Sequence, residues 1–337
     1  MKATELLLLC GFLGSGKTSL LVQHLAQADT RDTAVIVNEV GQIDIDGAVV
    51  AADASLPSVL LSNGCVCCSL VNDLQATIGA LQADRAARGQ PPFARIVLEC
   101  SGLSRPGPIL RSLHRLPGPA WDVRVLATFD LLHGERWLAT HDEAAAQLAA
   151  AQAIVLTKTD LVGEEPRQAA TALLRQLNPL AVVVDEAGPA LRARRAFDPA
   201  TVAAACGVVP LPQDDAPRAQ LLAHRRIRTL RLDLDPALDW EHLSLWLDDL
   251  VGFCGDRLLR LKGFVQPSDS PSPVLVQSVG TLFSPPRPVP AHAGKRLGLV
   301  LITRGLSAAE IETLDPACAA RVRAWSEYGA PDRLLAA

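Results

Sequence analysis

The chain has 337 residues, a formal net charge of −4 and 49% hydrophobic residues. This length suits about two domains, and the composition is that of an ordinary globular protein with ample material for a core. The acidic balance argues against binding to nucleic acid, which normally needs a basic face. The apolar run Leu6–Cys10 is too short for a membrane span of roughly 20 residues, and the flank contains Glu5, so we expect a cytoplasmic protein without a membrane partner.

The first 185 residues alternate short apolar runs with helical patterns. The runs are β-branched or leucine-rich without polar alternation, as in strands covered on both faces. They span residues 5–10, 33–38, 58–62, 94–99, 123–129, 153–157 and 180–184. Helical patterns lie between them, for example over 17–28, 70–83 and 142–152. This alternation predicts an α/β fold with a mostly parallel sheet flanked by helices.

The second part of the chain has a different pattern. Residues 186–226 lose the strand–helix rhythm and become rich in Arg, Pro and Asp, so we interpret them as a connecting region. Strands are predicted over 227–235, 257–265, 273–283 and 297–305, and helices over 239–254, with Asp239 as N-cap, and over 307–314, with a Ser307–Glu310 capping box. We therefore predict a first domain over 1–205, a linker over 206–226 and a smaller α+β domain over 227–337.

The stretch "GFLGSGKT" (11–18) lies between the first strand and the first helix. It fits the P-loop pattern, in which glycines let backbone N–H groups turn toward phosphate oxygens and the helix N-terminus adds a favourable dipole. Lys17 would reach the β- and γ-phosphates and Thr18 would ligate Mg²⁺. The alternative is a chance glycine-rich turn. The residues expected to bind the nucleotide here are Gly11, Gly14, Ser15, Gly16, Lys17, Thr18 and Ser19.

A second phosphate-side element is "IVLECSGL" (96–103). Glu99 ends a predicted strand, where P-loop proteins carry a metal-side carboxylate. It would hold Mg²⁺ directly or through water, or polarise the attacking water. The alternative is a carboxylate exposed to solvent at the end of a strand. The N–H of Gly102 would sense the γ-phosphate.

The stretch "LTKTDL" (156–161) follows another predicted strand and is typical of a guanine-binding loop. Asp160 would accept two hydrogen bonds from guanine, and adenine lacks that pair of donors. Lys158 would lie along the base. The usual motif begins with Asn, but Thr157 stands here and offers one short hydroxyl in place of an amide.

Three cysteines crowd into "SNGCVCCSL" (62–70) at the start of a predicted helix. Cys65, Cys67 and Cys68 would form thiolates that suit Zn²⁺, Cu⁺ or another borderline-to-soft ion. A redox pair and inert packing are the alternatives. As a metal site the set is one ligand short, and a carboxylate, a water or a partner's group would complete it. The remaining cysteines are scattered and are interpreted as packing residues: Cys10, Cys100, Cys206, Cys254 and Cys318.

The acidic stretch "NEVGQIDID" (38–46) follows the second predicted strand, where P-loop GTPases carry a nucleotide-sensing switch. Glu39 is placed to contact Mg²⁺, water or a transported metal. A solvated acidic loop is the alternative. We expect Lys17, Glu39 and Glu99 to take part in catalysis.

These motifs together resemble those of the CobW-like P-loop GTPases, in the same order and over nearly the whole chain. The Cys-x-Cys-Cys element at 65–68 and the late "LLRLKGFV" are part of the resemblance. It implies a GTP-hydrolysing, metal-binding protein that serves as a metallochaperone or insertase, with zinc or cobalt as the usual metal. It also implies a C-terminal domain linked to partner recognition or assembly. Several positions depart from the family pattern: Gln42, Asp44, Ser104, Arg105 and Thr157, and there is no histidine-rich stretch.

The resulting hypothesis is a slow GTPase that binds a transition metal under nucleotide control and delivers it to a client metalloprotein or a metal-cofactor pathway, with a homodimer as one possible assembly. GTP, Mg²⁺ and Zn²⁺ or Co²⁺ are the expected ligands. Two alternatives stay open from the sequence. One is a nucleotide-dependent regulatory protein with a structural zinc, and the other is a thiol-redox, nucleotide-dependent enzyme.

Overall fold

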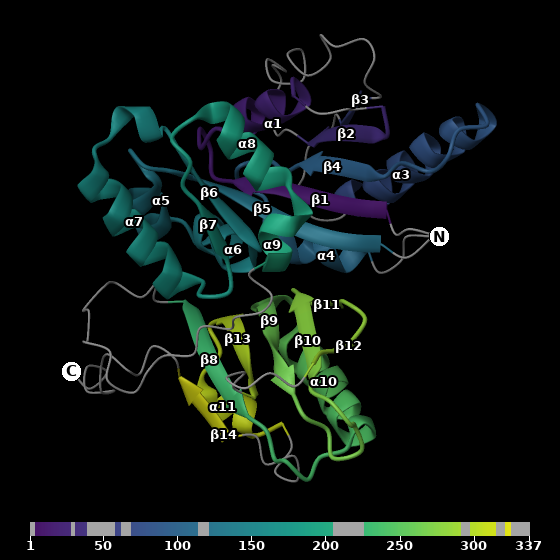
Figure 1. Cartoon of the computed structure of the whole chain (residues 1–337), viewed down its shortest axis with the longest axis vertical. Coiled ribbons are helices and arrows are strands. Elements are labelled where there is room, and N and C mark those ends of the chain that lie inside the picture. Colours follow the sequence, from purple (N-terminus) through teal and green to yellow (C-terminus); the bar gives the residue numbers. More distant parts are fainter. Residues whose placement is uncertain are drawn as a thin grey trace.

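A computed structural model of the chain describes residues 4–27, 31–38, 58–61, 69–113, 121–204, 226–290, 297–314 and 321–324. Two sheets dominate the described part (Figure 1). The first lies in the N-terminal part of the chain and the second in the C-terminal part. No described helix has the length and hydropathy needed to cross a membrane.

The first sheet is parallel throughout, and its seven described strands run in the order β3-β2-β4-β1-β5-β6-β7. The strands are β1 (Thr4–Gly11), β2 (Thr33–Asn38), β3 (Ser58–Leu61), β4 (Arg95–Glu99), β5 (Trp121–Asp130), β6 (Ala153–Thr157) and β7 (Val182–Val184). All seven predicted runs are therefore confirmed as strands. The residues of β1 and β6, and those of β4 after Arg95, are buried, as expected for strands covered on both faces.

Helices cover both faces of this sheet. On β1, Leu6 and Leu8 face one core and Leu7 and Leu9 face the other, because successive side chains point to opposite sides. The second of these cores is covered by α1 (Lys17–Leu25) and α8 (Pro189–Phe197). The first is covered by α3 (Ser69–Ala87), α4 (Pro106–Leu113), α5 (Gly134–Thr140), α6 (Asp142–Ala150) and α7 (Glu164–Leu177). The predicted α/β fold is confirmed.

The interpretation of residues 186–226 as one connecting region is wrong in its first half. Helix α8 and the short α9 (Pro199–Ala204) occupy 189–204. In α8, Ala193, Ala196 and Phe197 form a buried stripe against the sheet, at the three- and four-residue spacing of a helix face. The arginines of α8 obscured this stripe in the sequence. The predicted linker 206–226 lies outside the described residues, apart from Arg226.

The second sheet is antiparallel, as expected for an α+β domain, and follows the order β11-β10-β9-β13-β8-β14, with β12 paired to β10. Its strands are β8 (Ile227–Asp233), β9 (Leu258–Val265), β10 (Val274–Val279), β11 (Leu282–Phe283), β12 (Arg287–Pro288), β13 (Gly298–Arg304) and β14 (Arg321–Ala324). One predicted strand, 273–283, is instead a hairpin, because Gly280 adopts a φ of 55° and reverses the chain.

Two helices cover one face of the second sheet. Helix α10 (Trp240–Cys254) begins at Asp239, whose carboxylate accepts a hydrogen bond from the N–H of His242. Helix α11 (Ala308–Glu312) begins with the capping box of Ser307 and Glu310. Both predicted caps are confirmed. The apolar residues of these helices form a separate core with the sheet.

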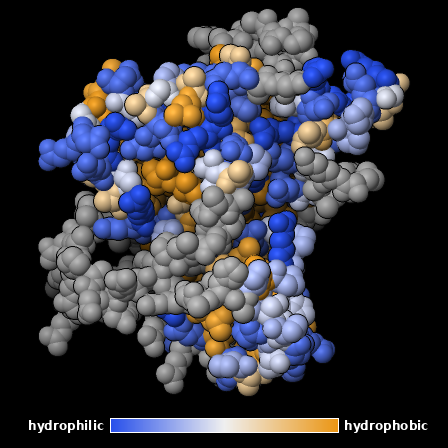
Figure 2. All heavy atoms as spheres, in the orientation of Figure 1, coloured by the Kyte–Doolittle hydropathy of each residue, from blue (hydrophilic) through white to orange (hydrophobic). Residues whose placement is uncertain are grey.

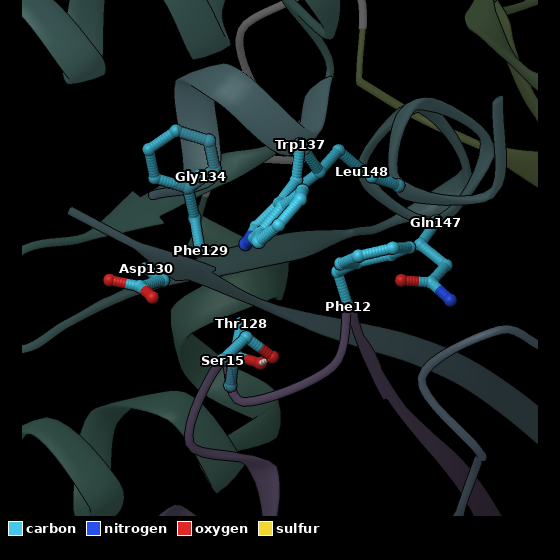
Figure 3. A pocket seen from close by; sticks show the side chains of 10 residues that line it. Phe12, Ser15, Thr128, Phe129, Asp130, Gly134, Trp137, Gln147 and Leu148 are labelled. Atoms are coloured by element: carbon cyan, nitrogen blue, oxygen red, sulfur yellow. Dashed lines mark hydrogen bonds between the residues drawn. The ribbon is translucent and has the colours of Figure 1, made fainter. Parts of the chain in front are cut away.

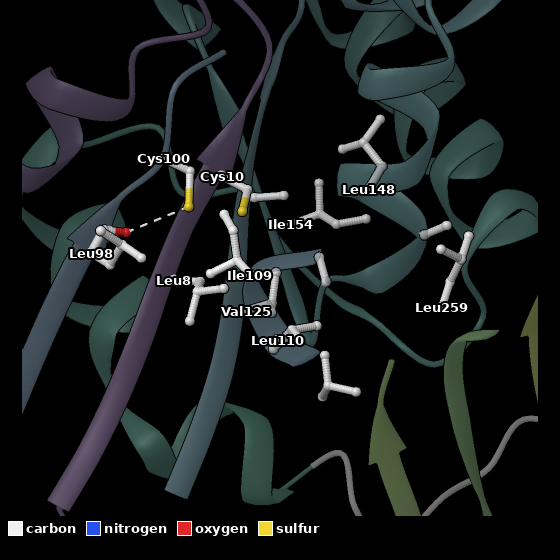
Figure 4. Close-up of a cluster of buried hydrophobic side chains, with 14 of the residues drawn as sticks. Leu8, Cys10, Leu98, Cys100, Ile109, Leu110, Val125, Leu148, Ile154 and Leu259 are labelled. Carbon is white, nitrogen blue, oxygen red and sulfur yellow. Dashed lines mark hydrogen bonds between the residues drawn. The ribbon is translucent and has the colours of Figure 1, made fainter. Parts of the chain in front are cut away.

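The opposite face of the second sheet shares a core with the first. Leu259 belongs to the same hydrophobic cluster as Leu148 of α6 (Figure 4). Ile302 is part of this cluster as well. Figure 2 shows hydrophobic residues mainly in the middle of the molecule, with hydrophilic residues over the outer helices. At the C-terminal end of α6, the carbonyl of Ala151 accepts hydrogen bonds from Asn178 and from Arg260 of β9. The two sheets are thus joined by apolar packing and by a charge-assisted hydrogen bond.

His24 of α1 generates a pH prediction. Its ring stacks on Phe197 with centroids 3.9 Å apart, and Nε2 lies 3.2 Å from Nη1 of Arg95. Burial, and secondly the positive charge of Arg95, lower the pKa of His24 from 6.5 to about 4. Protons therefore favour the unfolded chain, and stability present above pH 6.5 is lost as the pH falls toward 4.

As the pH falls from 7 to 5, protonation of this histidine in the unfolded chain should lower the free energy of unfolding by about 2 kcal/mol. Urea unfolding of the wild type and of His24→Gln at both pH values measures the effect. The variant should lose most of that pH dependence, because Gln does not titrate. Equal pH dependence in the two proteins would contradict the assignment.

Candidate functional site

The C-terminal ends of β1, β4, β5 and β6 meet at one edge of the parallel sheet, where α/β proteins bind ligands. The loop between β1 and α1 adopts three left-handed conformations, with φ of 146° at Gly11, 68° at Gly14 and 87° at Gly16. A side chain is also excluded at Gly11 by contact, since a Cβ there would overlap with the hydroxyl of Thr128. The predicted glycine requirement therefore has a physical basis, and the loop leads directly into the N-terminus of α1.

Lys17 and Thr18 begin α1 and lie at the centre of this site. Nζ of Lys17 donates to the carbonyl oxygens of Gly11 and Phe12, at 3.1 and 3.4 Å. The hydroxyl of Thr18 donates to Oε1 of Glu99, at 2.6 Å. Glu99 is only 5% exposed, so the alternative of a solvent-exposed carboxylate is wrong. A hydroxyl and a carboxylate side by side are hard oxygen donors and fit Mg²⁺.

Ser15 anchors the loop to the sheet. Its hydroxyl is buried and lies 2.6 Å from the hydroxyl of Thr128 on β5. Its carbonyl accepts a hydrogen bond of 2.8 Å from Thr157 of β6. The side chain of Ser15 thus points toward β5, and its backbone carbonyl is held by β6. Ser19, in the first turn of α1, is exposed.

Thr157 carries out a bridging role that the sequence did not reveal. Its buried hydroxyl lies within hydrogen-bond distance of two carbonyls, those of Ser15 and Phe129, at 2.8 and 3.1 Å. The short side chain suffices because the end of β6 lies close to the loop: a Cβ on Gly16 would lie 3.5 Å from Cγ2 of Thr157. The residue that departs from the expected Asn therefore connects the glycine-rich loop to the turn that carries Lys158 and Asp160.

Lys158 and Asp160 follow in a turn. Lys158 has a φ of 57°, which is rare for a residue with a side chain. Its Nζ lies 2.6 Å from Oδ2 of Asp130, while Asp160 is exposed in the adjoining η1 (Thr159–Leu161). The carboxylate of Asp160 is therefore accessible to solvent, and the ammonium group of Lys158 is held at the end of β5.

Asp130, at the end of β5, is a site residue that the sequence analysis missed. It is 3% exposed. Burial by itself would raise its pKa, but hydrogen bonds from Lys158, from the N–H of Leu132 and from His133 together hold the pKa below its usual value. Asp130 is therefore a carboxylate that orients Lys158. Its signal was an acidic residue directly after the apolar run "VLATF", as at Glu99.

Arg192 of α8 is a second residue that the sequence analysis missed. Its guanidinium is buried and donates to the hydroxyl of Thr159, at 2.7 Å, and to the carbonyl of Glu186, at 3.3 Å. Burial lowers the pKa of Arg192, and the negative charge of Asp160 acts in the opposite direction. Arg192 therefore supports the turn that carries Asp160. No local pattern distinguishes it from its arginine neighbours.

Gly102 lies in a tight turn after β4, closed by a hydrogen bond of 2.9 Å from the N–H of Ser104 to the carbonyl of Ser101. A Cβ on Gly102 would lie 2.7 Å from the backbone nitrogen of Leu13 in the phosphate loop. A glycine is thus needed for close approach between the two loops. Gly102 is buried against the loop in this structure.

The predicted transition-metal site lies outside the described residues. This holds for Cys65, Cys67, Cys68 and Glu39, and for Gln42, Asp44 and Asp46. Within the part of the chain that is described, no group of three or more His, Cys, Asp or Glu residues is placed to hold a metal ion. Cys10, Cys100 and Cys254 are buried free thiols, as predicted for packing residues.

Two family models match the chain. Residues 5–185 match the CobW/HypB/UreG nucleotide-binding domain, and residues 227–318 match the C-terminal domain of the cobalamin synthesis protein CobW. Together they include strands of both sheets, but β14 lies beyond the second match.

Curated relatives match over most of the chain. Zinc chaperone YjiA of Escherichia coli is 30% identical over 289 residues, which is 84% of this chain and 88% of that protein. Zinc chaperone CobW of Sinorhizobium sp. is 26% identical over 342 residues, which is 88% of this chain and 91% of that protein. The crystal structure of Zn(II)-bound YjiA GTPase from E. coli superposes with a TM-score of 0.65 at 26% identity, covering 94% of this chain and 99% of that one.

The bridging role of Thr157 leads to a prediction that needs no ligand. Thr157→Val keeps the shape of the side chain but removes the hydroxyl, which leaves buried carbonyls without this donor. We expect the free energy of unfolding to fall by about 1–2 kcal/mol and amide hydrogen exchange in residues 11–16 to accelerate. Thr157→Ser, which keeps the hydroxyl, is the matched control. Unchanged exchange in the Val variant would refute the bridge.

Proposed function

This chain belongs to the CobW/HypB/UreG family, and we propose that it is a GTPase that binds a transition metal under nucleotide control and delivers it to a client protein or a metal-cofactor pathway. The observation that carries the nucleotide half is the hydrogen bond between Thr18 and Glu99 beside the glycine-rich loop. The metal half is supported by the Cys-x-Cys-Cys sequence and by relatives that are named zinc chaperones. We propose domain limits of 1–205 and 227–337, joined by a linker over 206–226.

Thr18 and Glu99 would hold Mg²⁺. The ion would neutralise charge on the phosphates of GTP when it is bound. Because the Thr18 hydroxyl donates its proton to Glu99, the lone pairs of its oxygen are left for a cation. This favours a role for Glu99 behind Thr18 or through a water, rather than as the group that activates the attacking water. Glu39 is then the candidate for contact with that water or with the transported metal.

The phosphate loop and the base-side loop divide the recognition of GTP between them. Backbone N–H groups of residues 11–19 would surround the phosphates, and Lys17 would exchange its contacts with the Gly11 and Phe12 carbonyls for phosphate oxygens. Asp160 would accept the two guanine donors, and Lys158, oriented by Asp130, would lie along the base. Since the hydroxyl of Thr157 is directed to the carbonyls of Ser15 and Phe129, guanine preference would rest on Asp160.

Cys65, Cys67 and Cys68 are proposed as the transition-metal ligands, with zinc or cobalt as the cargo and Glu39 or a client's group as the fourth ligand. Thiolates select borderline and soft ions over Mg²⁺. The segments 39–57 and 62–68 follow β2 and β3, whose ends lie on the same edge of the sheet as the phosphate loop. Binding of GTP at that edge would order the ligands, and hydrolysis would release the metal.

One prediction of the proposed function concerns linkage between metal binding and nucleotide binding. Titration of the apoprotein with Co²⁺ or Zn²⁺ should give an affinity about 5–150-fold higher with GTP–Mg²⁺ than with GDP, and bound metal should raise the ratio of GTP affinity to GDP affinity by the same factor. Co²⁺–thiolate absorption reports cysteine ligation directly. Cys65→Ala with Cys67→Ala should abolish this absorption and leave GTP binding intact.

The control is Cys254→Ala, which removes a buried thiol from the core of the second sheet. Among the described residues, Cys254 belongs to no group of three or more His, Cys, Asp or Glu placed to hold a metal ion. Chelation that unfolds the protein, with no effect of GTP on metal affinity, would contradict the proposal and favour a structural zinc. A reversible disulfide in place of a bound metal would favour a thiol-redox enzyme.

A second prediction tests the turn after β4. Gly102→Ala should push the turn away from the loop, because its methyl group would lie 2.7 Å from the nitrogen of Leu13. We expect kcat for GTP hydrolysis to fall on the order of 100-fold, with GDP affinity nearly unchanged. Gly79→Ala on α3 is the matched control, since nothing lies within 4 Å of the added methyl. Normal GTP hydrolysis by Gly102→Ala would show that the close approach of Gly102 to the loop is not needed for hydrolysis.

A further inference from the structure

Helix α6 is buried on every side. All seven residues from Ala144 to Ala150 are buried, although a helix at a protein surface exposes about half of its residues. It contacts β1 and β5 of the first sheet and β8, β9 and β13 of the second. Its sequence, "DEAAAQLAA", is rich in alanine, which permits close packing on both sides. Within this buried run Gln147 is the one polar side chain.

Gln147 is 0% exposed and reaches the turn after β4. Its Nε2 donates to the carbonyl of Gly102 at 3.0 Å and to the carbonyl of Ser104 at 2.8 Å. Because both partners are acceptors, the amide can present only its NH₂ group to them, and its orientation is determined. Its Oε1 is buried and has no hydrogen-bond partner among the described residues. Burial of this amide is costly, and the two carbonyls are what it contacts.

A second contact from α6 reaches the same turn. Arg105 donates to the carboxylate of Glu143, at 2.6 and 3.1 Å, one turn of helix before Gln147. The segment 102–105 is therefore attached to α6 at three points. Since the turn is itself closed between Ser101 and Ser104, holding two of its carbonyls sets the rotation of its peptide groups.

Gln147 also lies behind the phosphate loop. It lines a cavity of about 10 Å³ together with Phe12 and Ser15 of the loop, Thr128 and Asp130 of β5 and Trp137 of α5 (Figure 3). A space of this size holds about one water molecule, so it is no ligand site. The amide of Gln147 therefore lies next to both the glycine-rich loop and the turn after β4, the two elements that would enclose the γ-phosphate.

We propose that Gln147 is a positioning residue for the γ-phosphate. Gln147 holds the carbonyls of Gly102 and Ser104 and thereby fixes the peptide groups that follow these two residues. The hydrogen bond from the N–H of Ser104 to the carbonyl of Ser101 passes this constraint to the Ser101–Gly102 peptide, which carries the N–H of Gly102. This inference rests on the proposed function and on the expectation that the N–H of Gly102 contacts the γ-phosphate, which GTP has and GDP lacks. Gln147 touches neither nucleotide, so its effect reaches the ligand only through the turn. Loss of the amide should therefore weaken the binding of GTP and leave the binding of GDP nearly unchanged.

The test compares the affinities of the full chain for GDP and for GTPγS, each with Mg²⁺, in the wild type and in Gln147→Glu. The substitution preserves shape but replaces the NH₂ donor with an acceptor, which would face two carbonyls. We expect GTPγS affinity to fall about tenfold or more, kcat for GTP to fall with it, and GDP affinity to stay within about twofold. Gln147→Met, which adds no charge, should show the same split if the Glu variant fails to fold.

The matched control is Gln75→Glu. Gln75 of α3 also donates its Nε2 to a backbone carbonyl, that of Ser112 at 2.6 Å, but away from the phosphate loop. It should leave the ratio of the two affinities unchanged. If the Gln147 variants lose both affinities equally, or lose neither, the positioning role is wrong. The proposed function would still stand in that case, provided that the wild type binds both nucleotides. A wild type that binds neither nucleotide would overturn both.

Discussion

The parallel pairing of β1 with β4 and β5 is the constraint on which the site depends. Leu9 pairs with Glu99 on one side, and Gly11 pairs with Thr128 on the other. This register brings the carboxylate to the hydroxyl of Thr18 and places Thr128 under the loop. Side chains alternate between the faces of a strand, so a shift of β4 by one residue would turn Glu99 to the opposite face. The hydrogen-bond register of the sheet thus sets which side chains lie beside the glycine-rich loop.

The same principle operates one strand further. Asp130 pairs with Thr157, which places an acidic residue beside Lys158 and a hydroxyl beneath the phosphate loop. The glycine-rich loop and the turn at 158–160 are therefore connected by side chains at strand ends rather than by the loops alone. Helix α6 extends this connection away from the sheet edge. It contacts the turn after β4 through Gln147, and at its other end the carbonyl of Ala151 accepts a hydrogen bond from Arg260 of the second sheet.

Most of the fold was predictable because its signals are local. Runs such as "ELLLLC" are strands on account of burial on both faces, and the helix caps at Asp239 and Ser307 involve residues three apart. Helix α8 was missed because three arginines share nine residues with its buried stripe, and its apolar face is recognisable only against α1 and the sheet. The hairpin at Gly280 was missed because apolar residues continue on both sides of the reversal.

The sequence by itself determined the α/β class, the glycine-rich loop and the residue types that surround it. Each of these follows from neighbours in the chain, through backbone freedom at glycine and strand or helix periodicity. The tertiary structure decided which side chains meet. Thr157 and Ser15 are 142 residues apart, Thr18 and Glu99 are 81 apart, and Gln147 and Gly102 are 45 apart. Such pairs depend on strand order, register and helix packing, and no local pattern encodes a contact between residues that only the folded sheet brings together.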